Sequence, residues 1–279
     1  MVSFPSGLMY FVGLEVILSV FGKFSNKIHF IGRMFNFALT TMAACTISIC
    51  CSPILIIMGS RTNINWLTGR VFYFLSRFFL GFTVEIEGQE HLDSKSPYVF
   101  IGNHQSYFDI VWLGATFPKK SVILSKKSVK YFPFVGWLMI LGDDIFINRG
   151  SKQSTSDMFK KASEILLAKK INVFFFPEGT RGTHKLGPSL FPFKKGAFLL
   201  ARHAKVPIVP LVVSDFHNIQ NPKNWWSTGG TIKLRVLPPI PMDKATDENL
   251  DDTIKKTWES MHSTLLEISP PRIDFKKLN

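Results

Sequence analysis

Cysteine is scarce in this sequence, and none is placed to support an extracellular or zinc-binding fold. The chain has 279 residues and three cysteines, Cys45, Cys50 and Cys51, all in one apolar stretch. Cysteines in such a setting behave as small hydrophobic residues, whereas disulfide frameworks are typical of short secreted domains. The composition therefore favours a catalytic part that faces a reducing compartment such as the cytosol.

Tyrosine and tryptophan are also few, although phenylalanine is abundant. The sequence has 27 Phe but only 5 Tyr and 6 Trp. Lys and Arg outnumber Asp and Glu by 33 to 20, so the chain should attract anionic partners such as phosphates or acidic lipid headgroups. No long basic arm concentrates this charge, and phenylalanine suits a core or lipid better than base stacking. We therefore expect no nucleic-acid partner.

The longest uncharged run is the strongest membrane signal in the chain. Residues 34–60 carry no charge, and as a helix they would be about 40 Å long, enough to cross a hydrocarbon core of about 30 Å. Pro53 would kink such a helix, so a re-entrant hairpin that stays in one leaflet is the alternative. A second apolar segment, residues 8–22, is marginal for insertion and has no cleavage site, so we interpret it as an anchor, with a buried core helix as the alternative. The basic residues between the two segments favour a shallow hairpin.

Three regions follow from this pattern. Residues 1–62 are expected to form a membrane anchor of two apolar helices, spanning or re-entrant. Residues 63–82 are expected to form an interfacial amphipathic helix with Arg70 and Arg77 spaced through an aromatic surface, or alternatively a core helix with snorkelling arginines.

In residues 83–279 short β-type runs alternate with helical ones, which predicts an α/β domain with a mixed, partly parallel sheet flanked by helices. Strands are expected at 83–87, 98–102, 121–125, 172–176, 207–213 and 231–237, and helices after His104 and at 154–170 and 250–266.

A histidine and an aspartate follow the strand expected at 98–102. His104 would emerge at the carboxyl edge of the sheet, where open α/β sheets commonly build their sites. Asp109 comes five residues later, so the two side chains can meet only if the chain turns around His104 before a helix begins. Such a carboxylate would fix the imidazole tautomer and leave the other nitrogen free as a base. Taken alone, the pair is more commonly a helix cap beside a surface histidine.

A second polar cluster follows the strand expected at 172–176, at the same predicted edge. Gly179 would let the backbone approach a ligand, Thr180 offers a hydroxyl, and Arg181 provides a planar fork suited to phosphate. The alternative is a structural turn in which Glu178 and Arg181 pair with each other.

Other basic residues are candidates for the same anion. Arg149 follows a short strand and is a second candidate phosphate clamp, and the lysines at 194–195 would extend the positive site. Three more lysines, Lys126, Lys127 and Lys130, precede an apolar helix, and side chains of this kind are more commonly just solvated.

Four ordered blocks of the sequence resemble those of the PlsC/AGPAT glycerolipid acyltransferases, over roughly residues 83–237. The blocks are His104-x4-Asp109, "GDDIFINR" ending at Arg149, "FPEGTR" at 176–181 and "VPIVPLVV" at 206–213. The first and third are similar to those of the eukaryotic 1-acyl-sn-glycerol-3-phosphate acyltransferases. The second block departs from the commoner pattern at its acidic pair, residues 143–144, to which we assign no role.

The resemblance implies a reaction and a role for each block. His104 would be the catalytic base and Asp109 its orienting partner. The expected reaction is transfer of a fatty acyl group from acyl-CoA, a co-substrate, to the sn-2 hydroxyl of 1-acyl-sn-glycerol-3-phosphate (lysophosphatidic acid). This would give phosphatidic acid and CoA for phospholipid biosynthesis, with no cofactor and no metal. The implied substrate-phosphate residues are Arg149, Glu178, Gly179, Thr180 and Arg181, and the implied acyl-CoA residues are Val206, Pro207, Ile208, Val209 and Pro210.

Several alternatives remain open at this stage. The acceptor could be another lysophospholipid, the protein could be a non-catalytic membrane protein that binds anionic lipid, or the same dyad could serve a hydrolase. The chain ends in "FKKLN", where Lys276 and Lys277 occupy the positions of a dilysine retrieval signal. We therefore expect the endoplasmic reticulum membrane, with the catalytic domain facing the cytosol, and the lipid droplet as a further location. The sequence predicts no oligomeric state.

Overall fold

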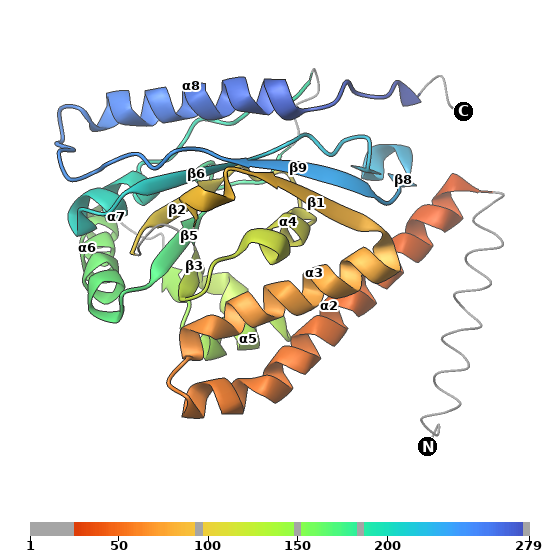
Figure 1. The fold of residues 1–279 in the computed structure, drawn as a ribbon, viewed down its shortest axis with the longest axis horizontal. Coiled ribbons are helices and arrows are strands. Elements are labelled where there is room, and N and C mark those ends of the chain that lie inside the picture. Colours follow the sequence, from red (N-terminus) through yellow and green to blue (C-terminus); the bar gives the residue numbers. More distant parts are fainter. Residues whose placement is uncertain (1–24, 93–96, 148–151, 183–186, 276–279) are drawn as a thin grey trace.

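A seven-stranded sheet forms the centre of the computed structural model, which describes residues 25–92, 97–147, 152–182 and 187–275. The strand order is β1-β9-β6-β2-β5-β3-β4 (Figure 1). Neighbouring strands are parallel except β6 and β9, which confirms the predicted mixed, partly parallel sheet and shows that it is mostly parallel. The strands are β1 (Phe82–Glu87), β2 (Val99–Gly102), β3 (Ser121–Lys126), β4 (Ile145–Ile147), β5 (Asn172–Phe175), β6 (Ile208–Val213) and β9 (Gly230–Val236).

Helices cover both faces of this sheet (Figure 1). Successive strand residues point to opposite faces, so Val99 and Ile101 join one buried cluster and Phe100 joins the other. The first cluster packs beneath α6 (Lys152–Lys169), α7 (Gly196–Ala204) and α8 (Leu250–Ile268). The second packs against α2 (Asn26–Ile57), α3 (Ile64–Leu80) and α4 (Asp109–Thr116). The other described elements are α5 (Val135–Leu141), a small hairpin of β7 (Gln220–Asn221) and β8 (Trp226–Ser227), and four short 3-10 helices, at Arg61–Asn63, Gln89–His91, Lys127–Tyr131 and Pro222–Asn224.

The elements expected from periodicity lie where the sequence predicts them. All six expected strands are present, and α6 and α8 overlap the two long helices expected in the α/β domain. The short helix α7 was missed, because it begins with Gly196 and has no side-chain N-cap hydrogen bond, so no start signal marks it.

The apolar anchor differs in detail from the expectation. Helix α2 begins before the uncharged run and includes Lys27 and Arg33, and Pro53 lies inside it without ending it. It is the one helix among the described residues that is long and apolar enough to cross a membrane. The second apolar segment, residues 8–22, lies outside the described residues. The helical hairpin that the structure describes pairs α2 with α3, the predicted interfacial helix.

Contacts near both ends attach α2 to the rest of the protein. Near its start, the guanidinium of Arg33 donates to the carbonyl oxygen of Leu80 at 2.6 Å and to Oγ of Ser227 at 3.3 Å. Just beyond its end, the Arg61 guanidinium donates to the carbonyl oxygen of Leu141 at 2.6 Å. The long helix therefore lies along the body instead of projecting away from it.

Two glycines let α3 and α4 approach closely. A Cβ atom added to Gly114 would lie 2.5 Å from the carbonyl oxygen of Gly69, closer than such contacts allow. Next to this contact the Arg70 guanidinium donates to the carbonyl oxygens of Gly114, at 2.7 Å, and Ala115 at the end of α4. Arg70 is thus bonded to the α/β domain through α4, the helix that begins at Asp109.

We predict that Gly114→Ala destabilises the protein by separating α3 from α4. The expected loss is about 1–3 kcal/mol of unfolding free energy, the usual cost of overpacking a close contact, measured by urea unfolding in mild detergent. Gly69→Ala is the matched control and should cost less, because its added Cβ would meet its nearest atom at 3.1 Å. Wild-type stability of the Gly114 variant would contradict this account of the contact.

Candidate active site

His104 and Asp109 meet at the carboxyl edge of the sheet, as the sequence predicts. His104 lies in the loop after β2, and its Nδ1 is 2.6 Å from Oδ2 of Asp109. The imidazole also stacks on Phe176, with ring centroids 3.7 Å apart and an angle of 16° between the planes. The His104 side chain is 18% exposed, and its Nε2 has no hydrogen-bond partner in the part of the chain that the structure describes. The imidazole is therefore held at one nitrogen and on one face, and the other nitrogen is available.

Asp109 is buried and surrounded by donors. Its Oδ2 also accepts from the backbone N–H groups of Gln105 and Ser106, each at 3.0 Å, and its Oδ1 accepts from the indole N–H of Trp112 at 3.2 Å. Burial raises the pKa of Asp109, and the hydrogen bond from His104 is the largest effect in the opposite direction. Because Asp109 accepts from Nδ1–H, the tautomer with an unprotonated Nε2 is favoured, which is the form that can accept a proton.

Glu178 joins the loop after β5 to the loop that carries His104. It is 3% exposed, and its two carboxylate oxygens accept from the backbone N–H groups of His104 and Phe191, both at 2.8 Å. The N–H of Gly182 in turn donates to the carbonyl oxygen of His104 at 3.2 Å. Both oxygens are thus bonded to backbone groups, and no ion pair with Arg181 is found among the described residues; a role of Glu178 at the phosphate site stays a prediction. Glu178 is a positioning residue for the His104 backbone.

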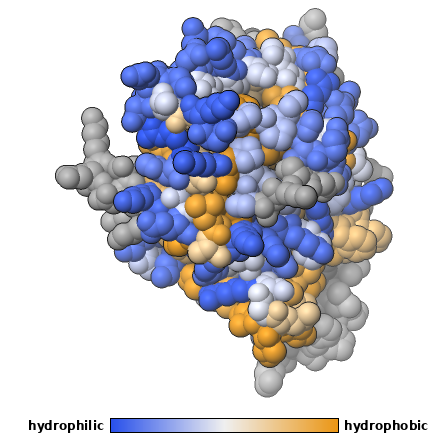
Figure 2. Space-filling model, turned by 60° about the vertical axis from the view of Figure 1, so that its left-hand side comes forward, coloured by the Kyte–Doolittle hydropathy of each residue, from blue (hydrophilic) through white to orange (hydrophobic). Residues whose placement is uncertain are grey.

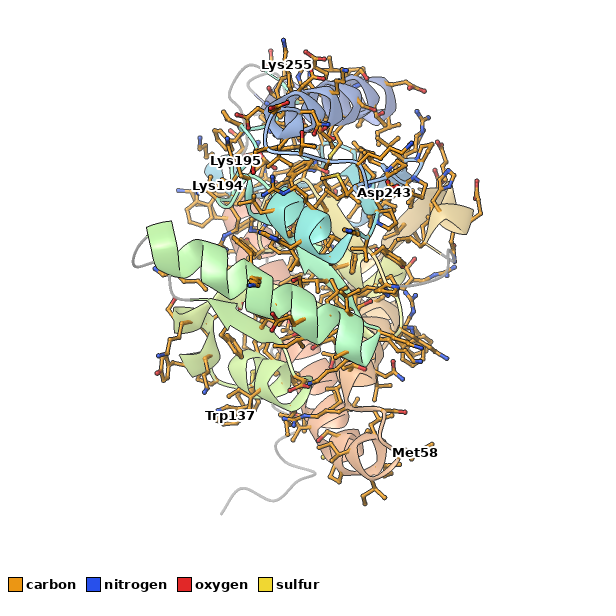
Figure 3. The ribbon with its side chains drawn as sticks, turned by 90° about the vertical axis from the view of Figure 1, so that its left-hand side faces the viewer. Met58, Trp137, Lys194, Lys195, Asp243 and Lys255 are labelled. Atoms are coloured by element: carbon orange, nitrogen blue, oxygen red, sulfur yellow. The ribbon has the colours of Figure 1, made fainter. Side chains whose placement is uncertain are left out.

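The turn after Glu178 presents positive charge beside His104. Gly179 has a φ of +66°, and a Cβ atom there would lie 2.8 Å from Nζ of Lys194, so this lysine lies directly against the turn. Thr180 and Arg181 are exposed, and among the described residues no hydrogen bond or ion pair holds the Arg181 guanidinium. Lys195, next to Lys194 in Figure 3, instead forms an ion pair with Asp251 at 2.7 Å. Arg149 lies outside the described residues.

The residues predicted to hold acyl-CoA are core residues of the sheet. Four of the five side chains are buried, and Pro207 accepts a hydrogen bond from the N–H of Val99 at 3.0 Å through its carbonyl oxygen. Ile208 pairs with Val99 and Pro210 with Ile101, so this stretch begins a strand at the edge opposite His104. The stretch Val206, Pro207, Ile208, Val209 and Pro210 therefore lies mainly in the sheet interior, and its predicted contact with acyl-CoA stays a prediction.

Two amide side chains beside His104 were missed by the sequence analysis. Asn103 is buried and exchanges two hydrogen bonds with the backbone of Val213, at 3.0 and 2.8 Å. Gln105 donates to the carbonyl oxygen of Ser214 at 2.9 Å. Both tie the His104 loop to the end of β6. The partners lie more than a hundred residues away along the chain, so only the run of polar residues after a buried strand hinted at this role.

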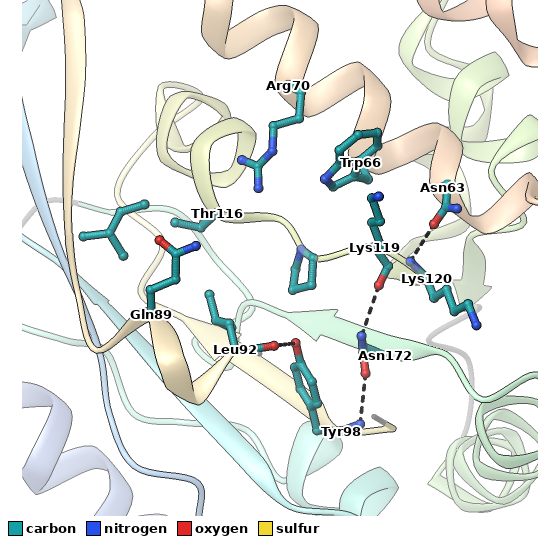
Figure 4. Close-up of a pocket in the computed structure, with 12 residues that line it drawn as sticks. Asn63, Trp66, Arg70, Gln89, Leu92, Tyr98, Thr116, Lys119, Lys120 and Asn172 are labelled. Atoms are coloured by element: carbon teal, nitrogen blue, oxygen red, sulfur yellow. Dashed lines mark hydrogen bonds between the residues drawn. The ribbon is translucent and has the colours of Figure 1, made fainter. Parts of the chain in front are cut away.

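Two cavities lie on the side of the sheet that α3 and α4 cover. A cavity of about 460 Å³ is found at the starts of β2 and β5, beside Tyr98 and Asn172, and therefore away from His104 (Figure 4). Arg70, Lys119 and Lys120 line it, and Lys119 lies over the ring of Trp66 at 4.8 Å from the ring centroid. A smaller, apolar cavity of about 150 Å³ lies among α2, α3, α4 and α5. No group of three His, Cys, Asp or Glu side chains that could hold a metal occurs within the described residues.

We predict that Glu178 makes stability depend on pH. Burial raises its pKa from 4.5 to about 7. A carboxyl group whose pKa is higher in the folded state than in the unfolded state stabilises the fold at pH values below its unfolded-state pKa. That contribution is lost as the pH rises through its folded-state pKa. Between pH 5 and 8 the wild type should therefore lose unfolding free energy relative to Glu178→Gln, measured by urea unfolding at each pH. Parallel pH curves for the two proteins would rule out this titration.

Comparison with known proteins identifies the family. Residues 83–214 match the Acyltransferase family. The chain is 39% identical to the 1-acyl-sn-glycerol-3-phosphate acyltransferase of Saccharomyces cerevisiae over 213 residues, which are 76% of this chain and 69% of that protein. It is 33% identical over 211 residues to the human beta form, covering 76% and 75% of the two chains. The fold matches the crystal structure of PlsC, the 1-acyl-sn-glycerophosphate acyltransferase from Thermotoga maritima, with a TM-score of 0.68. The two chains are 19% identical, and the match covers 89% of this chain and 100% of that one. With its His104–Asp109 pair inside the matched region, the chain belongs to the family of the 1-acyl-sn-glycerol-3-phosphate acyltransferases.

Proposed function

We propose that this protein transfers a fatty acyl group from acyl-CoA to the sn-2 hydroxyl of 1-acyl-sn-glycerol-3-phosphate, giving phosphatidic acid and CoA. The observation that carries the proposal is the His104–Asp109 pair, whose Nε2 has no partner among the described residues and lies beside a turn that presents positive charge. The names of the relatives support the acceptor, lysophosphatidic acid. The choice of acyl-CoA as donor is our inference, since a thioester carbonyl is the electrophile that an activated hydroxyl attacks directly.

The reaction needs one base and no covalent enzyme intermediate. Nε2 of His104 takes the proton of the sn-2 hydroxyl as its oxygen attacks the thioester carbonyl. The tetrahedral adduct then collapses, the carbon–sulfur bond breaks, and the proton on Nε2 passes to the departing CoA thiolate. General-base catalysis of this kind typically contributes about 10²- to 10⁴-fold, and holding both substrates in register supplies much of the rest.

The phosphate of the acceptor would bind at the turn after β5. Arg181 offers two parallel N–H donors, Thr180 a hydroxyl, and Lys194 a point charge against Gly179. Arg149 is kept as a proposed second clamp on the strength of its sequence block. The apolar cavity among α2, α3, α4 and α5 suits a fatty acyl chain, because its walls are almost entirely hydrophobic side chains.

Membrane association fits the apolar helix α2. We propose that the α2–α3 hairpin lies within one leaflet, because α2 is bonded to the body near both ends and exposes apolar residues between them. Location at the endoplasmic reticulum, with the catalytic edge facing the cytosol, rests on the two lysines at 276–277, which lie outside the described residues. The lipid droplet remains the second proposed location.

We predict that His104→Ala abolishes acyl transfer while leaving the fold intact. Purified wild type and variant would be assayed with one radiolabelled acyl-CoA and a panel of lysophospholipid acceptors, and the fold checked by circular dichroism. Transfer to lysophosphatidic acid by the wild type alone supports the proposal. Retained activity of the variant would remove the assignment of His104 as the base. Release of free fatty acid without an acceptor would identify a hydrolase. Absence of transfer by the wild type would favour a lipid-binding role.

Arg181→Ala should raise the KM for lysophosphatidate far more than the KM for acyl-CoA, because the guanidinium is proposed to hold only the acceptor phosphate. Arg181→Lys should recover part of the loss, since it restores the charge without the planar fork. The matched control is Lys195→Ala, which removes a neighbouring cation that Asp251 already pairs. Equal increases in the two KM values would remove Arg181 from the phosphate site.

A further inference from the structure

Residues 126–140, which we call the aromatic–lysine segment, expose an unusual group of aromatic side chains. Tyr131 is 75% exposed, Phe132 65% and Trp137 51%. Tyr and Trp are rare in this chain, and exposed aromatic side chains that lie close together commonly mark an interaction surface. The reaction proposed above assigns no role to any of these residues.

The charge of this segment has one sign. Lys126, Lys127 and Lys130 are exposed, and none of them forms an ion pair with another described residue. The sequence has no acidic residue from Ser121 to Gly142. The surface therefore combines unpaired positive charge with exposed aromatic rings, which is the composition of segments that bind an anionic lipid surface.

The exposed rings project from a well-packed base. Leu138 and Met139 of α5 are buried, and Leu138 packs in a cluster with Cys45 of α2 and Ile64 of α3. A Cβ atom on Gly136 would lie 2.4 Å from the carbonyl oxygen of Lys130, so the turn is closed tightly against α5. The aromatic side chains are thus held outward by packing beneath them, and burying them inside this chain would break those contacts.

The segment is continuous with the apolar end of the α2–α3 hairpin. The Arg61 guanidinium, in the turn between α2 and α3, donates to the carbonyl oxygens of Ile140 and Leu141 at 2.7 and 2.6 Å. In Figure 3 Met58 and Trp137 project from the same end of the molecule, and Figure 2 shows apolar surface gathered at that end. Lys126 ends β3, whose neighbour β5 leads into Glu178, so the segment also borders the edge that carries His104.

We infer that the aromatic–lysine segment is a membrane-docking element that seats the catalytic edge on an anionic bilayer. Its rings lie at the level of the lipid headgroups, and its lysines contact lipid phosphates. The inference goes beyond the proposed reaction and does not require it, because it assigns a surface and a class of lipid that can be measured without turnover.

The charge is tested with the purified full-length chain and phosphatidylcholine vesicles with or without phosphatidylserine. Lys127→Glu/Lys130→Glu should reduce the gain in binding from phosphatidylserine by about tenfold or more, since each cation near an anionic surface is worth about a factor of five. The matched control is Lys244→Glu/Lys255→Glu, which makes the same change in net charge at exposed positions in and next to α8, with Lys255 at the opposite end of the molecule (Figure 3). If both variants lose the same amount of binding, net charge alone drives it. If neither variant loses binding, the segment does not contact the membrane. Either outcome overturns the inference.

The aromatic contact is tested separately by fluorescence. Bromine-labelled phosphatidylcholine should quench wild-type tryptophan emission more than that of Trp137→Phe, whereas Trp258→Phe in α8 should be quenched as strongly as the wild type. Circular dichroism establishes that all variants are folded. Equal quenching of wild type and Trp137→Phe overturns the contact. A lipid-independent dimer that Phe132→Ser abolishes would show that a second copy of the chain occupies this surface instead, and would overturn the inference as well.

Discussion

The hydrogen bond between His104 and Asp109 is the interaction on which the geometry of this sheet edge depends, and it exists only because both oxygens of the Asp109 carboxylate have donors. Its oxygens accept from the imidazole, from two backbone N–H groups and from the Trp112 indole. A buried carboxylate without such donors would be costly, so the same bonds that orient His104 also make it possible to bury Asp109. The loop geometry and the tautomer of the His104 imidazole are thus fixed together.

Two other buried carboxyl groups also join separate segments: Glu178 through both of its oxygens, and Asp144 through Oδ1 alone, since its buried Oδ2 has no partner among the described residues. Glu178 accepts from two backbone N–H groups and joins the loops after β2 and β5. Asp144, whose role the sequence did not reveal, accepts from the N–H of Ile123 and from the side-chain amide of Asn65, both at 2.7 Å, and so ties α3 to β3. Burial raises the pKa of Glu178 to about 7 and of Asp144 to about 8. Each of these groups joins segments that no continuous strand or helix connects.

The sequence predicts those features that short-range patterns encode. The six strands follow from periodicity and strand ends. The five-residue spacing of His104 and Asp109 indicated only that the two could meet if the chain turned, and their pairing was implied by the resemblance to the acyltransferases. The roles of Glu178 and Asn103 could not be predicted, because their partners, Phe191 and Val213, come from loops and strands that only the tertiary fold brings near. The position of Val206 to Pro210 could not be predicted for a related reason: an apolar block can line a ligand site or form a sheet interior, and only its register against β2 places it in the sheet.

The position of the anchor follows from the same long-range bonds. An uncharged run of this length is compatible with a crossing, but Arg33 inside α2 donates to the carbonyl oxygen at the end of α3, and Arg61 donates to carbonyl oxygens at the end of α5. Moving α2 away from the body would leave these guanidinium groups and carbonyl oxygens to find other partners in an apolar medium. The hairpin and the body are therefore best treated as one unit, and a membrane that receives the apolar face of α2 also determines how the edge carrying His104 is presented to lipid.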